Sequence, residues 1–179
     1  MQSIVPQSHS EIDWSAIIKS GDRIFLGSNA AIPNALIDSL IENGKDIKDI
    51  EVTHIGTLSD ERWALPKHQR QFKVNTFFIH GNVIRQAVDE GRADYTPCFL
   101  SEVSSLFANN ILPLDAALIM VSPPDELGYC SLGVSVDVVM SAARSAKKIV
   151  AQINSQMPRT AGHSFIHISE FTACIEHEQ

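Results

Sequence analysis

Hydrophobic and polar residues alternate along the chain in two different patterns. Apolar runs of about four to eight residues that stop at Gly, Asn or Pro are typical of buried strands, and apolar residues spaced three and four apart are typical of helices. Strands are predicted at residues 23–26, 50–55, 76–79, 93–95, 116–121, 148–153, 164–169 and 172–175. Helices are predicted at residues 14–20, 33–43, 82–90, 101–109 and 137–146.

Strands that alternate with helices predict an α/β fold: a mostly parallel open sheet with helices on both faces. The crossovers between parallel strands are expected to be right-handed. A length of 179 residues suits a single domain that covers residues 1–179. Two helix starts are also predicted, with Ser10 and Asp13 in a capping box and Asn82 as the cap of the helix at 82–90.

Residues 115–137, DAALIMVSPPDELGYCSLGVSVD, are the most informative stretch of the chain. An apolar run ends abruptly at Ser122, and a polar loop then leads through a glycine-rich turn into a helix. In an open α/β sheet such a junction lies at the carboxyl ends of the strands, where ligands bind. The loop is longer than a simple connection requires, which favours a binding role.

Four predicted strand ends carry loops suited to ligand contact. They are residues 27–33, 56–57, 80–82 and 122–133. Glycine lets the backbone approach a ligand, and a helix that starts after such a loop attracts anionic groups. The same glycines are also what tight turns require, but four loops on one sheet edge favour a binding cleft. The chain has neither a GxGxxG dinucleotide fingerprint nor a P-loop.

Composition narrows the classes of function. A net charge of −7 argues against a nucleic-acid partner, because phosphate backbones attract basic surfaces. Three widely spaced cysteines without a CxxC pair argue against a disulfide framework or zinc site, and the seven histidines show no metal-binding spacing, so no metal is expected. Without a long apolar run or a signal peptide, we expect a soluble cytoplasmic protein that does not cross a membrane.

Individual reactive residues each have a structural interpretation as well. Packing is the favoured role for Cys130, and Ser131 lacks the GxSxG context of a hydrolase nucleophile. The acids Asp125 and Glu126 are either paired catalytic carboxylates or, as we favour, turn-forming acids after Pro124. Three arginines lie beside Gly or Pro where they can meet a carboxylate, namely Arg85, Arg92 and Arg159. The basic stretch at 67–73 suits phosphate contact or simple solvation.

Three stretches of the chain resemble the amino-terminal half of the acetyl-CoA hydrolase/transferase family, which includes 4-hydroxybutyrate CoA-transferases. They are FFIHGNVIRQAVDEGRADYTPCFLSEV (77–103), LDAALIMVSPPDELGYCSLGVSVDV (114–138) and VAQINSQMPRTAGHSFIHISE (150–170). Residues 21–36 resemble the family's first glycine loop more loosely, because Ser28, Asn29 and Ala30 replace a more glycine-rich loop. The resemblance implies a CoA-transferase-like fold of the NagB/RpiA/CoA-transferase-like type.

The resemblance also implies a divided active site. Family members attack acyl-CoA with a glutamate and form a glutamyl-CoA thioester. That glutamate lies in the carboxyl-terminal half, in a motif like Asn-Ser-Ala-Ile-Glu-Val-Asp, which is absent from this sequence. We therefore expect residues 1–179 to form the amino-terminal half of a two-domain CoA transferase, without a catalytic residue of its own. The chain alone is expected to be inactive.

The first half would then supply one wall of the cleft, with coenzyme A and a short carboxylate such as acetate as substrates and no permanently bound cofactor. The expected substrate-binding residues, which include two of the arginines above, are Gly27, Ser28, Asn29, Ala30, Thr57, Gly81, Asn82, Arg85, Pro123, Glu126, Gly128, Tyr129 and Arg159. Two alternatives remain open: an acyl-CoA hydrolase, and a non-catalytic domain that binds CoA or another small molecule. The missing carboxyl-terminal domain is the expected partner, and exposed apolar surface predicts self-association into a homo-oligomer.

Overall fold

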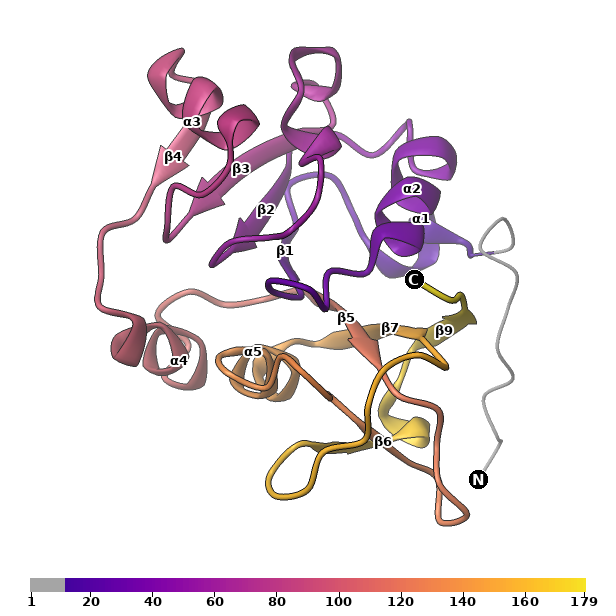
Figure 1. Ribbon diagram of the computed structural model, residues 1–179. Coiled ribbons are helices and arrows are strands. Elements are labelled where there is room, and N and C mark those ends of the chain that lie inside the picture. Colours follow the sequence, from indigo (N-terminus) through magenta and orange to yellow (C-terminus); the bar gives the residue numbers. More distant parts are fainter. Residues whose placement is uncertain (1–11) are drawn as a thin grey trace.

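The structure is a computed structural model that describes residues 12–179, and its centre is a seven-stranded parallel sheet in the order β4-β3-β2-β1-β5-β7-β9 (Figure 1). Every neighbouring pair in this sheet is parallel, which confirms the predicted fold class. The strands are β1 (Arg23–Leu26), β2 (Ile50–His54), β3 (Phe72–Thr76), β4 (Ala93–Tyr95), β5 (Ala116–Val121), β7 (Lys148–Ile153) and β9 (Ala173–Glu176). A second, antiparallel sheet pairs β6 (Tyr129–Ser131) with β8 (Phe165–His167).

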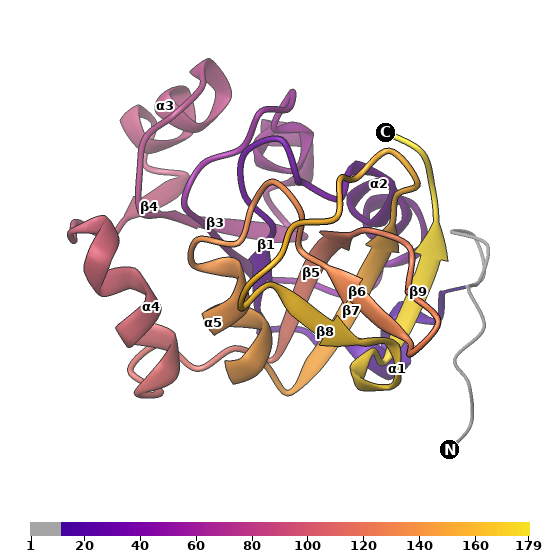
Figure 2. The ribbon, with the colours of Figure 1, turned by 60° about the horizontal axis from the view of Figure 1, so that its bottom comes forward.

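Helices cover both faces of the large sheet, as predicted (Figure 1). They are α1 (Trp14–Ile17), α2 (Asn34–Asn43), α3 (Asn82–Asp89), α4 (Leu100–Ala108) and α5 (Val139–Ser145), with 3-10 turns η1 (Arg62–Ala64), η2 (Pro66–His68) and η3 (Ile168–Glu170). One apolar cluster joins the sheet to α1, α2 and α3. The other joins the opposite face to α4, α5 and the β6–β8 sheet, which lies across β5 and β7 (Figure 2).

The central strand β5 shows why this arrangement buries so much apolar surface. All six of its residues are buried. Ala116 and Leu118 pack with α2, whereas Ala117, Ile119 and Val121 pack on the opposite face. A strand covered on both sides needs a continuous apolar run rather than an alternating one, which is what the sequence AALIMV provides.

The predicted strand at 76–79 is wrong, because β3 is Phe72–Thr76. Phe72 and Val74 point into the core while Lys73 between them is exposed, so the strand follows a period-two pattern. The apolar run that suggests a strand, at residues 77–79, lies where the chain leaves the sheet. Phe77 still packs in the core there, which explains its hydrophobicity without a strand.

The carboxyl-terminal strands and the polar loop also differ from the prediction. The segment at 164–169 contains a strand of only three residues, β8, and continues as η3. Its partner β6 lies inside the loop after β5, where no strand is predicted. Strands this short pair only because the two segments pack together on the large sheet, a tertiary effect that local sequence pattern does not reveal.

Two predicted helix caps are also wrong. Asp13 is itself the cap of α1, accepting hydrogen bonds from the amides of Ser15 and Ala16, and Ser10 lies outside the described residues. Gly81 occupies the cap position of α3, and Asn82 is the first helical residue. A side chain distant in sequence does the capping there, because the Glu61 carboxylate accepts the amide hydrogen of Ile84 at 3.1 Å.

Candidate functional site

The parallel sheet brings the four predicted loops to one edge. The loops after β1, β2, β3 and β5 all leave the carboxyl ends of their strands. The sheet grows in one direction from β1 through β2 to β4 and in the other from β5 to β9, so the direction of winding changes between β1 and β5. In open α/β sheets such a switch point opens a crevice where ligands bind.

The first two loops are tied together by backbone hydrogen bonds. The Asn29 amide donates to the Gly56 carbonyl at 2.9 Å, and the Leu58 amide donates to the Asn29 carbonyl at 3.1 Å. Asn29 has a positive φ of 51°, which lets the chain turn back at this point. Gly27 is required for the same turn, because a Cβ there would lie 2.8 Å from the Ala31 carbonyl oxygen.

The four predicted residues of the first loop differ in their exposure to solvent. Asn29 and Ala30 are exposed to solvent. Gly27 and Ser28 are buried, and the Ser28 hydroxyl points inward to Ser135 and Asp137. The loop therefore presents two residues outward while its other two anchor it to the protein.

The second loop continues a buried polar cluster. Among the described residues, buried side-chain nitrogen and oxygen atoms without a hydrogen-bond partner occur only within residues 53–63, in Thr53, His54, Thr57, Glu61 and Trp63. Native proteins satisfy most buried polar groups, and exceptions concentrate at functional sites and where water or ligand binds. Of these five, only Thr57 is predicted from the sequence, since no motif or spacing distinguishes the others.

His54 and Glu61 have perturbed ionisation. Burial lowers the pKa of His54 to about 4, so the imidazole is neutral near pH 7, and its ring lies edge-on to Trp63 at 6.1 Å between centroids. Burial also raises the pKa of Glu61, and the hydrogen bond from the Ile84 amide opposes that shift. The Glu61 carboxylate lies against Gly81, where any side-chain carbon would collide with it.

The loop after β5 folds back on itself. Asp125 accepts hydrogen bonds from the amides of Leu127 at 3.0 Å and Tyr129 at 2.8 Å, which confirms the turn-forming interpretation of this acid. The bond from the Tyr129 amide is the main reason that the pKa of Asp125 lies below its usual range. Arg159 forms an ion pair with Asp125 at 2.5 Å and donates to the Tyr129 carbonyl, so its partner is an internal carboxylate.

The reactive residues of this loop are held in structural roles. Cys130 is fully buried, and burial raises its pKa to about 12, which agrees with packing rather than nucleophilic chemistry. The Ser131 hydroxyl accepts the amide hydrogens of Gly133 and Thr160. Gly128 has a φ of 84°, and a Cβ there would lie 2.6 Å from His167 Nε2, so this turn also needs glycine. Glu126 is exposed at the tip of the loop.

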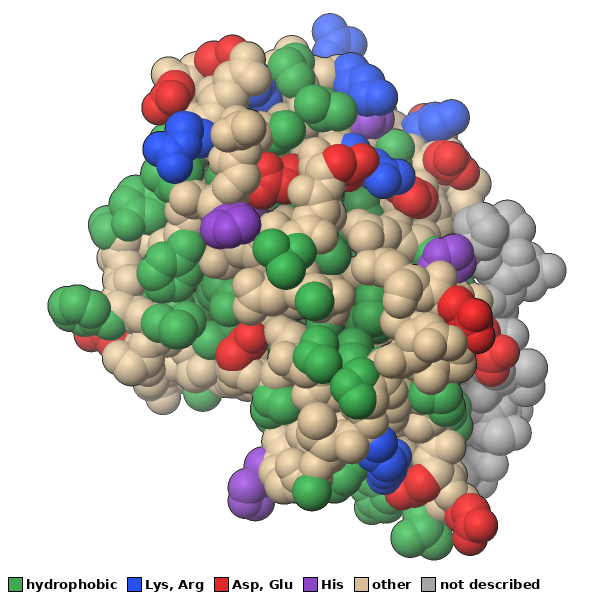
Figure 3. Space-filling model, in the orientation of Figure 1, with side chains coloured by type: hydrophobic (Ala, Val, Ile, Leu, Met, Phe, Trp, Pro, Cys, Tyr) green, Lys and Arg blue, Asp and Glu red, His purple; other side chains and the backbone are tan. Residues whose placement is uncertain are grey.

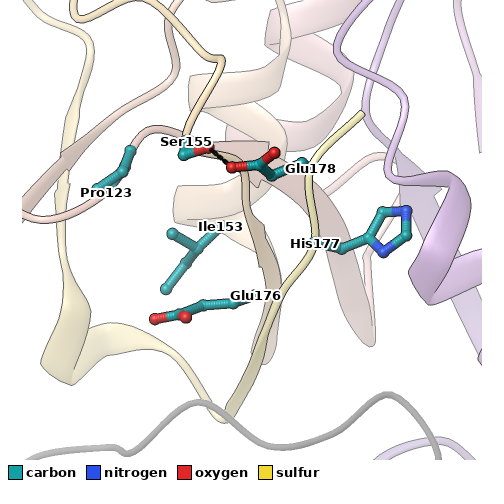
Figure 4. A pocket seen from close by; sticks show the side chains of 6 residues that line it. All are labelled: Pro123, Ile153, Ser155, Glu176, His177 and Glu178. Atoms are coloured by element: carbon teal, nitrogen blue, oxygen red, sulfur yellow. Dashed lines mark hydrogen bonds between the residues drawn. The ribbon is translucent and has the colours of Figure 1, made fainter.

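Two other predicted residues are on the surface. Arg85 is exposed on α3. Pro123 lines a hollow of about 280 Å³ beside β7 and β9, together with Ile153, Ser155 and three consecutive residues, Glu176, His177 and Glu178 (Figure 4). Glu178 is hydrogen-bonded to Ser155 there, and His177 points away from Ile153 (Figure 4). Two carboxylates make this hollow unsuited to the phosphates of CoA.

The basic stretch lies at the opposite edge of the sheet. Lys67, His68 and Arg70 precede β3 and, with Lys45 and Lys48, line a hollow of about 270 Å³. These residues are near the amino ends of the strands, so they cannot reach a ligand in the crevice. Within residues 12–179, no group of three or more metal-ligating side chains occurs, and no helix has the length and apolar character needed to cross a membrane.

The sequence matches the family model described as "Acetyl-CoA hydrolase/transferase N-terminal domain" over residues 7–179. The chain is 42% identical over 159 residues to the 4-hydroxybutyrate coenzyme A transferase of Clostridium kluyveri, which covers 89% of this chain and 37% of the relative. It is 45% identical over 157 residues to a Fasciola hepatica protein named succinyl-CoA:acetate/propanoyl-CoA:succinate CoA transferase, covering 87% of this chain and 32% of that protein.

Two solved structures also match nearly the whole chain. RipA from Yersinia pestis superposes with a TM-score of 0.82 at 28% identity, covering 97% of this chain and 42% of RipA. A 4-hydroxybutyrate CoA-transferase from Porphyromonas gingivalis superposes with a TM-score of 0.76 at 30% identity, covering 97% of this chain and 39% of that protein. The chain thus spans well under half the length of each of these relatives.

Proposed function

Because this chain belongs to the family of acetyl-CoA hydrolase/transferase N-terminal domains, we propose that it forms one wall of the active site of a CoA transferase. The proposed reaction moves CoA between a short-chain acyl-CoA and a carboxylate such as acetate. The observation that carries the proposal is the convergence of four loops on one sheet edge, around the switch point between β1 and β5. The similar proteins named as CoA transferases support this reaction class.

The proposed nucleophile is a glutamate outside this chain, as in the family. Its carboxylate attacks the acyl-CoA thioester carbonyl and CoA leaves as thiolate, which gives a mixed anhydride. The thiolate then attacks the glutamyl carbonyl, releases the donor carboxylate and leaves a glutamyl-CoA thioester. An acceptor carboxylate reverses these two steps and departs as the new acyl-CoA.

The described residues support a wall rather than a complete centre. Cys130 is buried as a thiol, and the Ser131 hydroxyl is occupied by backbone amides. Asp125 is held by Arg159 and two amides. Among residues 12–179, none of these candidates is paired with a general base, which nucleophilic catalysis by serine or cysteine requires. We therefore expect no turnover by this chain alone.

An assay of acyl-CoA:acetate exchange tests the proposal. The chain is measured alone and together with a polypeptide that corresponds to the remaining part of its relatives. We expect exchange only in the mixture, and mass spectrometry should find the covalent CoA adduct on the added polypeptide. Turnover by the thoroughly purified chain alone, or an adduct on this chain, would refute the divided site.

Acyl-CoA hydrolysis is the second candidate, because the matching family description names hydrolase as well as transferase activity. In that reaction water replaces the acceptor carboxylate. Product analysis of the same mixture with and without acetate separates the two. CoA release that is independent of acetate favours the hydrolase, whereas new acetyl-CoA that depends on acetate favours the transferase.

A non-catalytic binding domain is the third candidate. Within the described part of the chain, the lack of a general base beside Cys130 and Ser131 is compatible with it. Calorimetric titration of the chain with CoA, combined with a lack of exchange in the mixture, would favour this role over both enzymes.

A further inference from the structure

Three side chains join the loop after β1 to the segment that leads into α5. Ser28 follows β1, and Ser135 and Asp137 lie in the connection from β6 to α5. The Ser28 hydroxyl donates to Asp137 Oδ2 at 2.7 Å, the Ser135 hydroxyl reaches the same oxygen at 3.0 Å, and the two hydroxyls are in hydrogen-bond contact with each other. Ser28 and Ser135 are 0% and 3% exposed, whereas Asp137 is exposed, so two buried hydroxyls meet a carboxylate that lies at the surface.

Asp137 also holds the start of α5. Its other oxygen, Oδ1, accepts the amide hydrogens of Val138 at 2.5 Å and Val139 at 3.1 Å. One carboxylate therefore fixes the first turn of a helix on one side and the β1 loop on the other. Since α5 packs firmly through Ala142 and Ala143, it provides a rigid base for the joint.

The position of the joint determines where the exposed loop residues lie. Ser28 is directly followed by Asn29 and Ala30, which are exposed to solvent. Asn29 in turn is bonded to Gly56 and Leu58 of the second loop. A displacement of Ser28 would therefore move both loops together, and misplacement by about 1 Å can reduce catalysis by roughly a hundredfold.

We propose that Asp137 is a positioning residue, which holds the β1 and β2 loops in the geometry that acyl-CoA binding and transfer require. This inference rests on the proposed function for its catalytic consequence, but its structural part can be tested without it. The Ser28 hydroxyl is hydrogen-bonded to Asp137 and Ser135. We therefore expect the β1 loop to contact substrate through Asn29 and Ala30 and not through that hydroxyl.

The number of hydrogens available for hydrogen bonds among Ser28, Ser135 and residue 137 determines which variants test the proposal. The two hydroxyls supply two hydrogens for three contacts. In Asp137→Asn the amide adds two more hydrogens and keeps a carbonyl oxygen for the α5 amides, so all three contacts can persist. In Asp137→Ser the side chain keeps an oxygen that can accept an amide hydrogen of Val138 or Val139, but it is too short to reach both hydroxyls. Asp13→Ser, at the cap of α1, makes the same substitution away from the crevice.

Hydrogen exchange measured on the chain itself is the first experiment. We expect Asp137→Ser to increase exchange at the amides of residues 29–31 and 56–58 at least about tenfold, and Asp137→Asn and Asp13→Ser to leave these amides unchanged. Equal protection of these amides in Asp137→Ser and in the unchanged chain would overturn the proposal, because the loops would then not depend on the joint.

Steady-state kinetics of the two-polypeptide mixture is the second experiment. Asp137→Ser should lower kcat/KM for acyl-CoA about tenfold or more, and Asp137→Asn should restore it to within about twofold. Ser28→Ala combined with Asp137→Ser should cost no more than Asp137→Ser alone, because both remove one joint. If the mixture with the unsubstituted chain shows no acyl-CoA:acetate exchange, the proposed function is refuted. The hydrogen-exchange experiment then still decides whether Asp137 holds the two loops.

Discussion

Glu61 buries a carboxyl group at a point where the backbone is itself constrained. Its side chain is 2% exposed, its φ is 51°, and one of its oxygens caps α3. The other oxygen has no partner among the described residues. Burial penalises the charged form and raises the pKa, so the folded protein binds the Glu61 proton more tightly than the unfolded chain does.

The pH dependence of stability follows from this shift. Because the folded pKa lies above the unfolded value of about 4.3, the contribution of Glu61 to stability is fully present below that value and is lost as pH rises through the folded pKa. Glu61→Gln keeps the shape and an acceptor for the Ile84 amide but does not titrate. We expect it to be more stable than the unchanged chain at pH 8 and to lose this advantage near pH 4, as measured by urea unfolding. An advantage that does not vary with pH would contradict the assignment.

At the scale of elements, α3 depends on glycine for two different reasons. Gly81 has a φ of 85° and lies against the Glu61 carboxylate, whereas Gly91 has a φ of 68° and open space around it, where an added side-chain carbon would meet no atom within 4 Å. Gly91→Ala should cost only the left-handed backbone penalty of roughly 1–2 kcal/mol. Gly81→Ala should cost roughly 1–3 kcal/mol more, since it also forces the carboxylate to move. Urea unfolding of both variants measures the difference, and equal losses would show that the Glu61 contact is not limiting.

The strands and helix caps show which parts of the fold the sequence predicts and which it does not. The strands at 23–26, 93–95, 116–121 and 148–153 have the predicted bounds. Apolar runs mark three of them locally, whereas β4 has the sequence ADY and is not marked by such a run. The predicted cap Asn82 is wrong because Glu61, twenty-three positions before Ile84, does the capping. The predicted position of β3 is wrong since Phe77 is apolar for tertiary packing and not for strand pairing. Ser135 and Asp137 are likewise absent from the predicted site, because their partner Ser28 is distant in sequence.

At the scale of the whole molecule, apolar side chains are exposed on the edge that carries the loops. Leu58, Tyr95, Phe99, Leu100 and Val134 are 47–76% exposed. Figure 3 shows hydrophobic side chains gathered over the connection from β4 to α4. Contiguous apolar surface of this kind commonly marks a protein–protein interface. We expect the carboxyl-terminal polypeptide to cover it and, without that partner, a second copy of this chain.

Replacement of Phe99, which is 76% exposed, tests this expectation. Phe99→Ser removes a large apolar side chain that no packing within the chain requires, so the fold should be unaffected while self-association weakens about tenfold, a loss of roughly 1.4 kcal/mol. Ile111→Ser is the matched control, because Ile111 is 62% exposed but follows α4 at the opposite edge of the sheet. Sedimentation equilibrium of both variants and of the unchanged chain measures the dissociation constants. If Ile111→Ser weakens self-association as much as Phe99→Ser does, the interface is not confined to the edge that carries the loops. An equal effect would mean that the loss of an exposed apolar side chain weakens association wherever that side chain lies.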